Sequence, residues 1–284
     1  MNFYSITSKG NPNTNNLLRE ACEKRNIKYS EIDISNINFY KLPELNKGDL
    51  LYRVSLNTKA FILEKILVKK GVATLYKSTE DVIFKNVAVF SATMQTISLE
   101  KSNLPIPKTI YIVPKEKQLL KKYINQKIGK PPYVIKISPS MQGQGIFRVD
   151  SYASLNSIID FLFSINQQFL IRKYIPVTSS ARLVVLGNKV ISSIQFTAPS
   201  DDFRSNVQFH SSIAKNFSPA IKRTAIKATH VLGYEFGGVD ILISHGRHYL
   251  TEVNFPCCFH RTQEISGVDI AGKIIDYLVA KSKK

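Results

Sequence analysis

Two consecutive segments decide the fold: residues 237–244, Gly-Gly-Val-Asp-Ile-Leu-Ile-Ser, and residues 247–254, Arg-His-Tyr-Leu-Thr-Glu-Val-Asn. Both carry the β-branched and apolar residues that favour strands, and the His-Gly pair between them is typical of a turn. The pattern therefore predicts an antiparallel hairpin. Its apolar residues predict burial, and its polar residues are the candidates for function.

The register of this hairpin determines which side chains meet. A three-residue loop over residues 245–247 predicts three facing pairs: Ser244 with His248, Leu242 with Leu250, and Asp240 with Glu252. Because side chains alternate along a strand, Asn254 lies on the same face as Glu252. The hairpin thus gathers two carboxylates and one amide on a single face.

Two facing carboxylates are unfavourable unless something binds between them. Facing Cβ atoms are only about 4.5–5.5 Å apart, and like charges there are destabilising. The hairpin places no cation opposite either acid, although the chain has 39 lysines and arginines. An oxygen-only set of Asp240, Glu252 and Asn254 is what a hard cation such as Mg²⁺ accepts. The hairpin alone is equally consistent with a solvated turn whose acids repel weakly across water.

A second polar signal lies between two predicted strands, residues 133–138 and 146–149. Their loop contains Gln-Gly-Gln-Gly at residues 142–145, and glycine lets backbone N–H groups approach phosphate oxygens closely. Lys136 is the single charge of the first strand and supplies a cation beside the loop. The segment is consistent with a phosphate-binding loop, and an ordinary hairpin turn is the alternative.

The remaining periodicity places these motifs in a mixed α/β chain. In residues 1–88, strands are expected at residues 3–7, 29–34, 49–54 and 73–76, with helices at residues 15–25 and 60–70. This alternation favours a small parallel α/β sheet. No Gly-x-Gly-x-x-Gly opens its first helix, which excludes a dinucleotide fold of the usual kind. Further helices are expected at residues 89–102, 115–126, 152–165, 218–232 and 269–281, and further strands at residues 109–113, 168–175, 182–186 and 189–196.

The chain of 284 residues has a formal net charge of +18. Such a surplus attracts anions, including nucleotides, nucleic acid, acidic peptides and membrane headgroups. A lysine-rich genome composition is the alternative explanation. The lysines between residues 115 and 130 favour a solvated helix face rather than a binding groove.

Three cysteines, Cys22, Cys257 and Cys258, have neither disulfide-framework nor zinc spacing. The N-terminal residues do not form a signal peptide, and no apolar run approaches the ~18 residues of a membrane span. We therefore expect a soluble protein of a reducing compartment, the cytoplasm.

From about Thr93 to its C-terminal end, the chain resembles the ATP-grasp superfamily, and within it the RimK-type ligases that join glutamate-like amines to carboxylates. The motifs that carry the resemblance are Val134-Ile135-Lys136 and residues 142–145, 202–206 (Asp-Phe-Arg-Ser-Asn), 238–242, 252–254 and 267–273. The resemblance implies three parts: an N-terminal α/β domain at residues 1–88, a central lid subdomain at 89–171, and a C-terminal metal-binding subdomain with an antiparallel sheet at 172–284.

The resemblance also implies roles for individual residues. The nucleotide is contacted by the phosphate-binding Lys136, by the closing loop with Gln142, Gly143 and Gly145, by the adenine-holding hinge Arg172, Lys173, Tyr174 and Ile175, and by Asn206. Arg182 and Arg204 are the catalytic candidates, placed toward the transferred phosphate and the acyl phosphate. Asp240, Glu252 and Asn254 match the metal-binding residues, which agrees with the hairpin geometry.

The chain departs from the family pattern in three places. A second nucleotide lysine is expected just before Thr93, where this chain has Val-Phe-Ser-Ala at residues 89–92. The hinge continues as Pro-Val-Thr-Ser-Ser at residues 176–180 in place of acidic residues that hold ribose. Residues 255–259, Phe-Pro-Cys-Cys-Phe, replace a small-residue turn with Pro-Gly. These departures predict weaker nucleotide binding and an altered acceptor specificity.

The expected function is an ATP-dependent carboxylate–amine ligase that uses ATP and Mg²⁺ or Mn²⁺ and proceeds through an acyl phosphate. Its expected partners are ATP and the carboxylate and amine of an amino acid, a peptide or a protein terminus, including acidic ones. A membrane partner is not expected, nucleic acid is disfavoured, and a homo-oligomer stays open. The alternative is a basic polyanion-binding or nucleic-acid-binding protein on a degenerate ATP-grasp scaffold.

Overall fold

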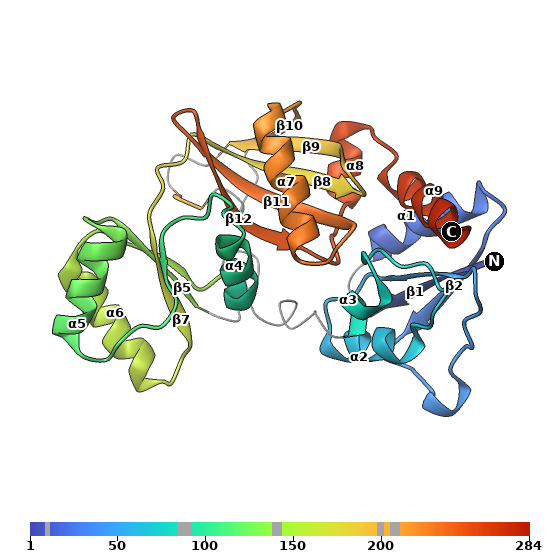
Figure 1. Cartoon of the computed structure of the whole chain (residues 1–284), viewed down its shortest axis with the longest axis horizontal. Helices are drawn as coiled ribbons and strands as arrows, with labels where there is room; N and C mark the ends of the chain where they lie inside the picture. Colours follow the sequence, from blue (N-terminus) through green and yellow to red (C-terminus); the bar gives the residue numbers. More distant parts are fainter. Residues whose placement is uncertain (9–11, 84–91, 138–143, 198–201, 205–210) are drawn as a thin grey trace.

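The computed structural model describes residues 1–8, 12–83, 92–137, 144–197, 202–204 and 211–284. These residues form three β-sheets along an elongated molecule (Figure 1). A parallel sheet lies at one end, a five-stranded antiparallel sheet in the middle, and a four-stranded antiparallel sheet at the other end. The expected mixed α/β class is confirmed.

The N-terminal unit is a parallel sheet of order β2-β1-β3. Its elements are β1 (Asn2–Thr7), α1 (Pro12–Glu23), β2 (Lys28–Asp33), η1 (Phe39–Lys41), β3 (Leu50–Arg53), α2 (Thr58–Leu67) and α3 (Thr79–Ile83). The strand expected at residues 73–76 is wrong, because that segment makes two isolated bridges, Ala73 to Leu50 and Tyr76 to Tyr234. Tyr76 thereby joins the N-terminal unit to the middle of the molecule.

The central part has a sheet of order β4-β7-β5-β6, covered by helices. Its elements are α4 (Ala92–Lys101), β4 (Thr109–Ile110), α5 (Lys117–Tyr123), the π-helical turn η3 (Ile124–Ile128), β5 (Tyr133–Ile137), β6 (Ile146–Val149), α6 (Tyr152–Ser164) and β7 (Phe169–Lys173). A separate core joins Ile135 and Ile171 of the sheet to Leu120 and Leu155 of the helices. The boundary expected after residue 171 falls inside β7, whose last residues pair with β5 and β4.

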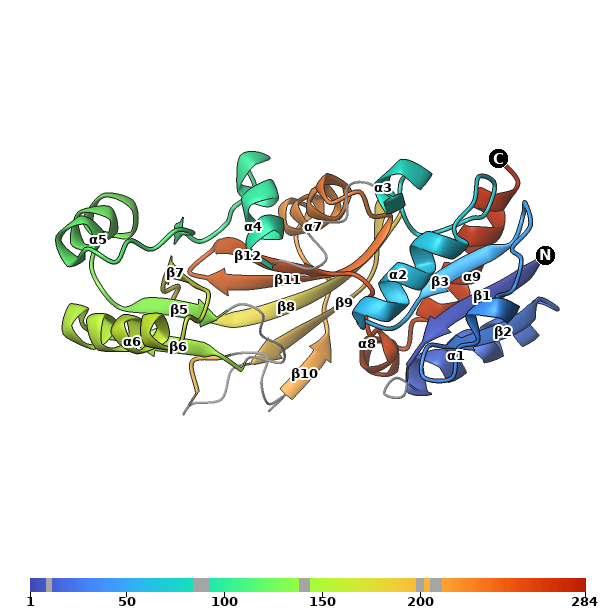
Figure 2. The same cartoon turned by 90° about the horizontal axis from the view of Figure 1, so that it is seen from below.

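The C-terminal part has a sheet of order β10-β9-β8-β11-β12, so β12 is an edge strand. Its elements are β8 (Ser179–Leu186), β9 (Lys189–Thr197), β10 (Ser211–Ala214), α7 (Pro219–Val231), β11 (Phe236–Ser244), β12 (Arg247–Asn254), α8 (His260–Ser266) and α9 (Ile270–Ser282). Strand β10 and helix α8 were not expected from the sequence. Figure 2 shows α4 and α7 on one side of this sheet. Among the described helices, none is long and apolar enough to cross a membrane.

The hairpin forms with a shorter turn than expected. Ser244 pairs with Arg247, so the loop has two residues, His245 and Gly246, both with positive φ. That register alone would bring Asp240 opposite Thr251. A bulge between Asp240 and Ile241 corrects it, and Asp240 pairs with Glu252 as expected. The predicted pairs nearer the turn are therefore wrong, whereas the predicted carboxylate pair is confirmed.

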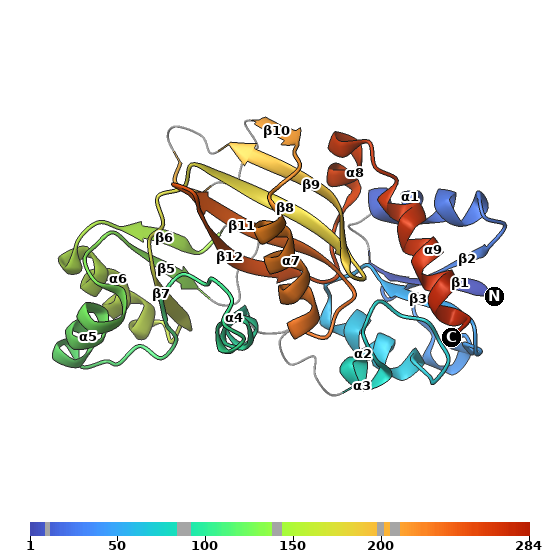
Figure 3. The ribbon, with the colours of Figure 1, turned by 45° about the horizontal axis from the view of Figure 1, so that its top comes forward.

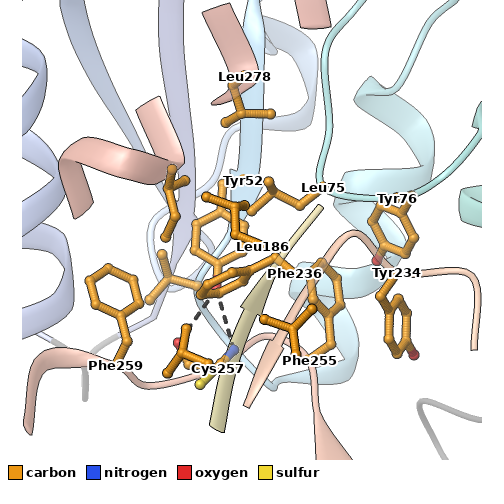
Figure 4. Packing of buried hydrophobic residues seen from close by; sticks show 14 of the residues in the cluster. Tyr52, Leu75, Tyr76, Leu186, Tyr234, Phe236, Phe255, Cys257, Phe259 and Leu278 are labelled. Carbon is orange, nitrogen blue, oxygen red and sulfur yellow. Dashed lines mark hydrogen bonds between the residues drawn. The ribbon is translucent and has the colours of Figure 1, made fainter. Parts of the chain in front are cut away.

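An aromatic cluster joins the N-terminal unit to the middle sheet (Figure 4). Phe255 stacks on Tyr234 at 4.5 Å between ring centroids and meets Tyr76 edge-on at 4.8 Å. Tyr52 packs against both Phe236 and Phe255. On the other side of the interface the C-terminal helix α9 returns to lie beside α1, as Figure 3 shows. The large core is therefore shared, and the two parts pack as one body.

A buried ion pair lies beside this cluster. The Arg53 guanidinium donates to Glu64 at 2.8 Å, and both side chains are at most 1% exposed. Arg53 also donates to the Ser55 carbonyl at 2.8 Å, and the Tyr76 hydroxyl donates to Glu64 at 2.8 Å. Such a pair is fully hydrogen-bonded, but the loss of one partner would leave a buried charge unpaired.

We expect Glu64→Gln to lower the free energy of unfolding by about 3–5 kcal/mol, because it leaves the Arg53 charge buried without a counter-charge. Urea denaturation followed by circular dichroism measures this. The matched control is Glu44→Gln, which removes the partner of Lys69 in a pair whose side chains are 80% and 53% exposed. Exposed pairs contribute about 0–1 kcal/mol. Equal losses in the free energy of unfolding in both variants would contradict the stabilising role of the buried Arg53–Glu64 pair.

Candidate active site

The carboxylates and the amide of the hairpin converge on one point. Asn254 Nδ2 lies 3.0 Å from Asp240 Oδ2 and 3.4 Å from Glu252 Oε1. No group of three or more His, Cys, Asp or Glu side chains suited to a metal occurs in the described parts of the chain. A metal site at this hairpin therefore needs the Asn254 side-chain oxygen, Oδ1, as its third ligand, because the Nδ2 group that donates to the two acids cannot coordinate a cation. The set is oxygen-rich, which fits Mg²⁺.

The face of the sheet that carries the set is the one away from α7. A Cβ on Gly237 would meet Thr229 of α7, whereas one on the next residue, Gly238, would meet the Cys257 sulfur at 2.5 Å. Gly238 and Asp240 are two residues apart and share a face. Only glycine at position 238 allows Cys257 to approach this closely. The loop after Asn254 is thus packed directly against the site.

A cation compensates Asp240, contrary to the expectation from the hairpin alone. Strand β8 lies on the other side of β11 and places Arg182 directly opposite Asp240. The guanidinium donates to both carboxylate oxygens, Nε to Oδ1 at 2.8 Å and Nη2 to Oδ2 at 2.7 Å. Such a two-point geometry is the strongest that arginine makes with a carboxylate. The compensating charge comes from a neighbouring strand, which the hairpin pattern does not show.

A second cation reaches Glu252 from the central sheet. Lys136 on β5 lies 3.4 Å from Glu252 Oε2, and its side chain is 14% exposed. The neighbouring residue Ile135 belongs to the core under α5 and α6, so Lys136 points to the opposite face. Lys136 therefore bridges the central sheet and the edge strand of the middle sheet.

The pKa values of Asp240 and Glu252 are shifted in opposite directions. Burial raises the pKa of Asp240, although the adjacent Arg182 opposes part of the rise. Burial also acts to raise the pKa of Glu252, but the positive charges of Lys136 and Arg182 and hydrogen bonds from Asn254 and Lys136 outweigh it, and this pKa is lowered. Glu252, with 32% of its side chain exposed, is thus the readily ionised and accessible acid of the pair.

The four hinge residues differ in burial and in the groups that they contact. Arg172 is buried, and its Nη2 donates to the Thr96 hydroxyl at 2.7 Å. Lys173 is exposed, and its backbone N–H donates to the Lys108 carbonyl at 2.9 Å. Tyr174 lies under the Arg148 guanidinium at 4.7 Å, and Ile175 is buried. Of these four, Arg172 is the one tied to helix α4.

Other predicted residues lie at the edge of the site or outside the described chain. Arg204 is paired with Asp202 through two nitrogens, at 3.1 Å and 2.8 Å. Gly145 has a φ of 69° and accepts from the Ile137 N–H, which closes the β5–β6 hairpin. Gln142, Gly143 and Asn206 lie outside the described residues, as does the segment with Phe90.

Residues missed from the sequence hold strand β12, which carries Glu252 and Asn254, in place. The Gln95 amide of α4 makes two hydrogen bonds to the backbone of Val253. The Tyr52 hydroxyl of β3 makes two to the backbone of Cys257, at 3.3 Å and 3.5 Å, which Figure 4 shows as dashed lines. Burial raises the Cys257 thiol pKa to about 12, so it acts as a packing group. The only sequence signal for Gln95 is a polar residue on the buried side of a helix.

The geometry agrees with the match to known families. A model described as the RimK-like ATP-grasp domain matches residues 92–278. The chain belongs to this family. The match begins at the first residue of α4 and ends within α9, so it covers both antiparallel sheets of this RimK-like domain and leaves the N-terminal unit outside. The family expected from the sequence motifs is confirmed.

Curated relatives carry ligase names. This RimK-like chain is 32% identical over 191 residues to a probable alpha-L-glutamate ligase of Cellvibrio japonicus, covering 65% of this chain and 62% of the relative. It is 33% identical over 156 residues to a probable alpha-L-glutamate ligase of Ectopseudomonas mendocina, covering 54% and 52%. The aligned part therefore spans about half to three fifths of the length of these relatives.

Solved structures extend the likeness to the whole chain. The ATP-grasp ligase PsnB, complexed with a phosphomimetic variant of its minimal precursor, Mg and ADP, has a TM-score of 0.76 at 15% identity and covers 99% of this chain and 98% of its own. D-alanine–D-alanine ligase from Bacillus anthracis has a TM-score of 0.69 at 14% identity, covering 100% and 97%. At these identities the comparison confirms the ATP-grasp fold, including the N-terminal unit.

The charge balance at the site generates a two-sided prediction for Lys136→Met. Without nucleotide, Lys136 competes with a divalent cation for Glu252, so its removal should tighten Mn²⁺ binding. With nucleotide, Lys136 is the expected phosphate contact, so its removal should weaken binding of a non-hydrolysable ATP analogue. One charge-assisted hydrogen bond contributes about 1.5–3 kcal/mol, roughly ten- to a hundredfold in affinity.

Mn²⁺ binding is measured by paramagnetic resonance, and the analogue by titration calorimetry. The control is Lys122→Met, which removes an exposed lysine from helix α5 of the same central part. A Lys136→Met protein that binds the analogue like wild type would show that the nucleotide lies elsewhere.

Proposed function

We propose that this protein is an ATP-dependent carboxylate–amine ligase that forms an amide bond. The observation that carries the proposal is the set of Asp240, Glu252 and Asn254 between two cations that come from different sheets. The names of the curated relatives and the titles of the similar structures support the same reaction class. The ATP-grasp lobes are proposed to be the central part and the C-terminal part, with the N-terminal unit beside the acceptor.

Each residue of the set has a role in this reaction. Asp240, Glu252 and Asn254 would hold Mg²⁺, which when bound neutralises phosphate oxygens. Lys136 would bind a nucleotide phosphate, and the guanidinium of Arg182 holds Asp240 in place while facing the same space. Nucleotide contacts by Arg172, Lys173, Tyr174, Ile175, Gln142, Gly143, Gly145 and Asn206, and a catalytic contact by Arg204, belong to the proposal as well.

The chemistry requires positioned charge more than covalent catalysis. A substrate carboxylate oxygen attacks the terminal phosphorus of ATP, the bond to the bridging oxygen breaks, and ADP leaves. The amine then attacks the acyl carbon, loses a proton, and phosphate departs with its oxygen. Both steps gather negative charge on phosphate oxygens, which preorganised cations stabilise. No nucleophilic serine or cysteine is needed, in agreement with the raised pKa of Cys257.

The substrates are proposed by class. A structure of PsnB contains a precursor peptide, and the curated relatives are named for glutamate. An amino acid or a peptide is therefore the acceptor class to test first, with acidic peptides favoured by the +18 charge. The three cysteines, which form no disulfide with one another, fit the reducing conditions of the cytoplasm.

We expect Mg²⁺-dependent ADP release with an amino acid or acidic peptide, and we expect Glu252→Gln to abolish it while the protein stays folded. Glu252 is the accessible acid of the set, and its amide analogue lacks the charge that a divalent cation requires. A coupled ADP assay with products identified by mass measures turnover, and thermal unfolding measures the fold.

The control is Glu264→Gln, which removes the same charge from the exposed side of α8. Turnover that persists in excess EDTA, or in Glu252→Gln, would overturn the metal assignment. An absence of turnover together with tight polyanion binding would favour the alternative of a basic binding protein on this scaffold.

A further inference from the structure

Helix α4 contacts both sheets of the site through two adjacent side chains. Gln95 is 9% exposed and Thr96 is 2% exposed, so both are buried in a helix of ten residues. Gln95 reaches the middle sheet, and Thr96 reaches the central sheet. Because the two residues are adjacent on one helix and bond to different sheets, they fix the position of the two sheets relative to each other.

The Gln95 arm holds the metal-binding strand. Its Nε2 donates to the Val253 carbonyl at 2.7 Å, and its Oε1 accepts from the Val253 N–H at 3.0 Å. Strand β12 is an edge, so these backbone groups have no neighbouring strand on that side. The amide thus takes the place that a further strand would have. Val253 lies between Glu252 and Asn254, so a two-point bond there fixes the strand where both side chains project.

The Thr96 arm holds a buried cation. Its hydroxyl accepts from Arg172 Nη2 at 2.7 Å and donates to the Ala92 carbonyl of α4 at 2.7 Å. Arg172 pairs with Val134, so it lies on the same face of the central sheet as Lys136. Its Nε is buried and has no hydrogen-bond partner. Burial lowers the pKa of Arg172, and Glu252 is among the charges that act on it.

We propose that α4 is a two-armed positioning helix. Gln95 sets the geometry of the metal-binding residues, and Thr96 aims the Arg172 guanidinium at an acceptor atom of the nucleotide. This inference rests on the proposed function, because it assigns the two arms to the metal and the nucleotide of that same site. The chain lacks a lysine at residues 89–92, and Arg172 supplies the second cation beside Lys136.

The two arms predict opposite signatures for two neighbouring substitutions. Gln95→Met keeps the volume but loses both bonds to Val253, so it should raise the Mg²⁺ concentration required about tenfold and leave affinity for an ATP analogue at saturating Mg²⁺ unchanged. Thr96→Val keeps the shape but frees Arg172, so it should weaken the analogue about three- to tenfold and leave the Mg²⁺ requirement unchanged. These sizes follow from about 0.5–1.5 kcal/mol for each hydrogen bond.

The experiment combines two titrations of the full chain. Calorimetry with a non-hydrolysable ATP analogue at saturating Mg²⁺ gives nucleotide affinity, and Mg²⁺ titration at saturating analogue, followed by thermal shift, gives the metal requirement. Ser98→Ala is the control, since its hydroxyl bonds the helix's own Met94 carbonyl. Hydrogen exchange at the Val253 amide gives a readout without ligands, and it should quicken in Gln95→Met and stay unchanged in Thr96→Val.

We expect each variant to change one quantity: Gln95→Met raises the Mg²⁺ requirement, and Thr96→Val weakens binding of the ATP analogue. Equal shifts of both parameters in both variants would show that α4 only supports the fold, and unchanged parameters would exclude the arms altogether. If Gln95→Met does not fold, Gln95→Glu keeps an acceptor for Val253 and should show the same selective rise in Mg²⁺ requirement. If wild type binds no Mg²⁺ and nucleotide, the proposed function fails, and faster exchange at Val253 then supports only the structural part of the Gln95 arm.

Discussion

The Arg182–Asp240 pair is the interaction on which the rest of the site depends. Two carboxylates face each other across β11 and β12, where burial and the facing Glu252 raise the pKa of Asp240. The two-point contact from Arg182 pairs the Asp240 carboxylate, and Glu252 is left with the longer contact to Lys136 at 3.4 Å. The order β8-β11-β12 places the cation, the buried acid and the accessible acid on three neighbouring strands, and the proposed function depends on this order.

The edge position of β12 creates a second constraint, since an edge strand is the most easily displaced part of a sheet. Contacts from three parts of the chain restrain it. Gln95 bonds Val253, the Leu250 N–H donates to the Pro105 carbonyl at 2.8 Å, and Tyr52 bonds Cys257 just beyond the strand. These restraints hold the edge strand in place, and the proposed metal site requires such rigidity.

The hairpin, the family and the carboxylate pair were predictable from the sequence because they depend on local pattern. The sequence did not show the exact register of the hairpin or the contacts between distant segments. The two-residue turn shifts the register by one residue from the predicted one, and the bulge at Asp240 shifts it back. The alternation of side chains in the sequence shows neither feature. Arg182 is the partner of Asp240 because β8 lies beside β11, and no local sequence pattern predicts that pairing. Gln95 lies 158 residues from Val253, and a buried glutamine in a short helix has no distinctive spacing.

The charges of the site are balanced, although the protein as a whole is strongly basic. Asp240 and Glu252 are matched by Arg182 and Lys136, so the described set is close to neutral while the chain as a whole carries +18. The surplus lies outside the set, where it raises the local concentration of anionic ligands and is screened by salt. Inside the set, each cation is tied to one acid at short range, where screening is weak. Under the proposed function, attraction and positioning are therefore separated: the surface charge would raise the local concentration of the nucleotide, and the paired charges would fix the position of its phosphates.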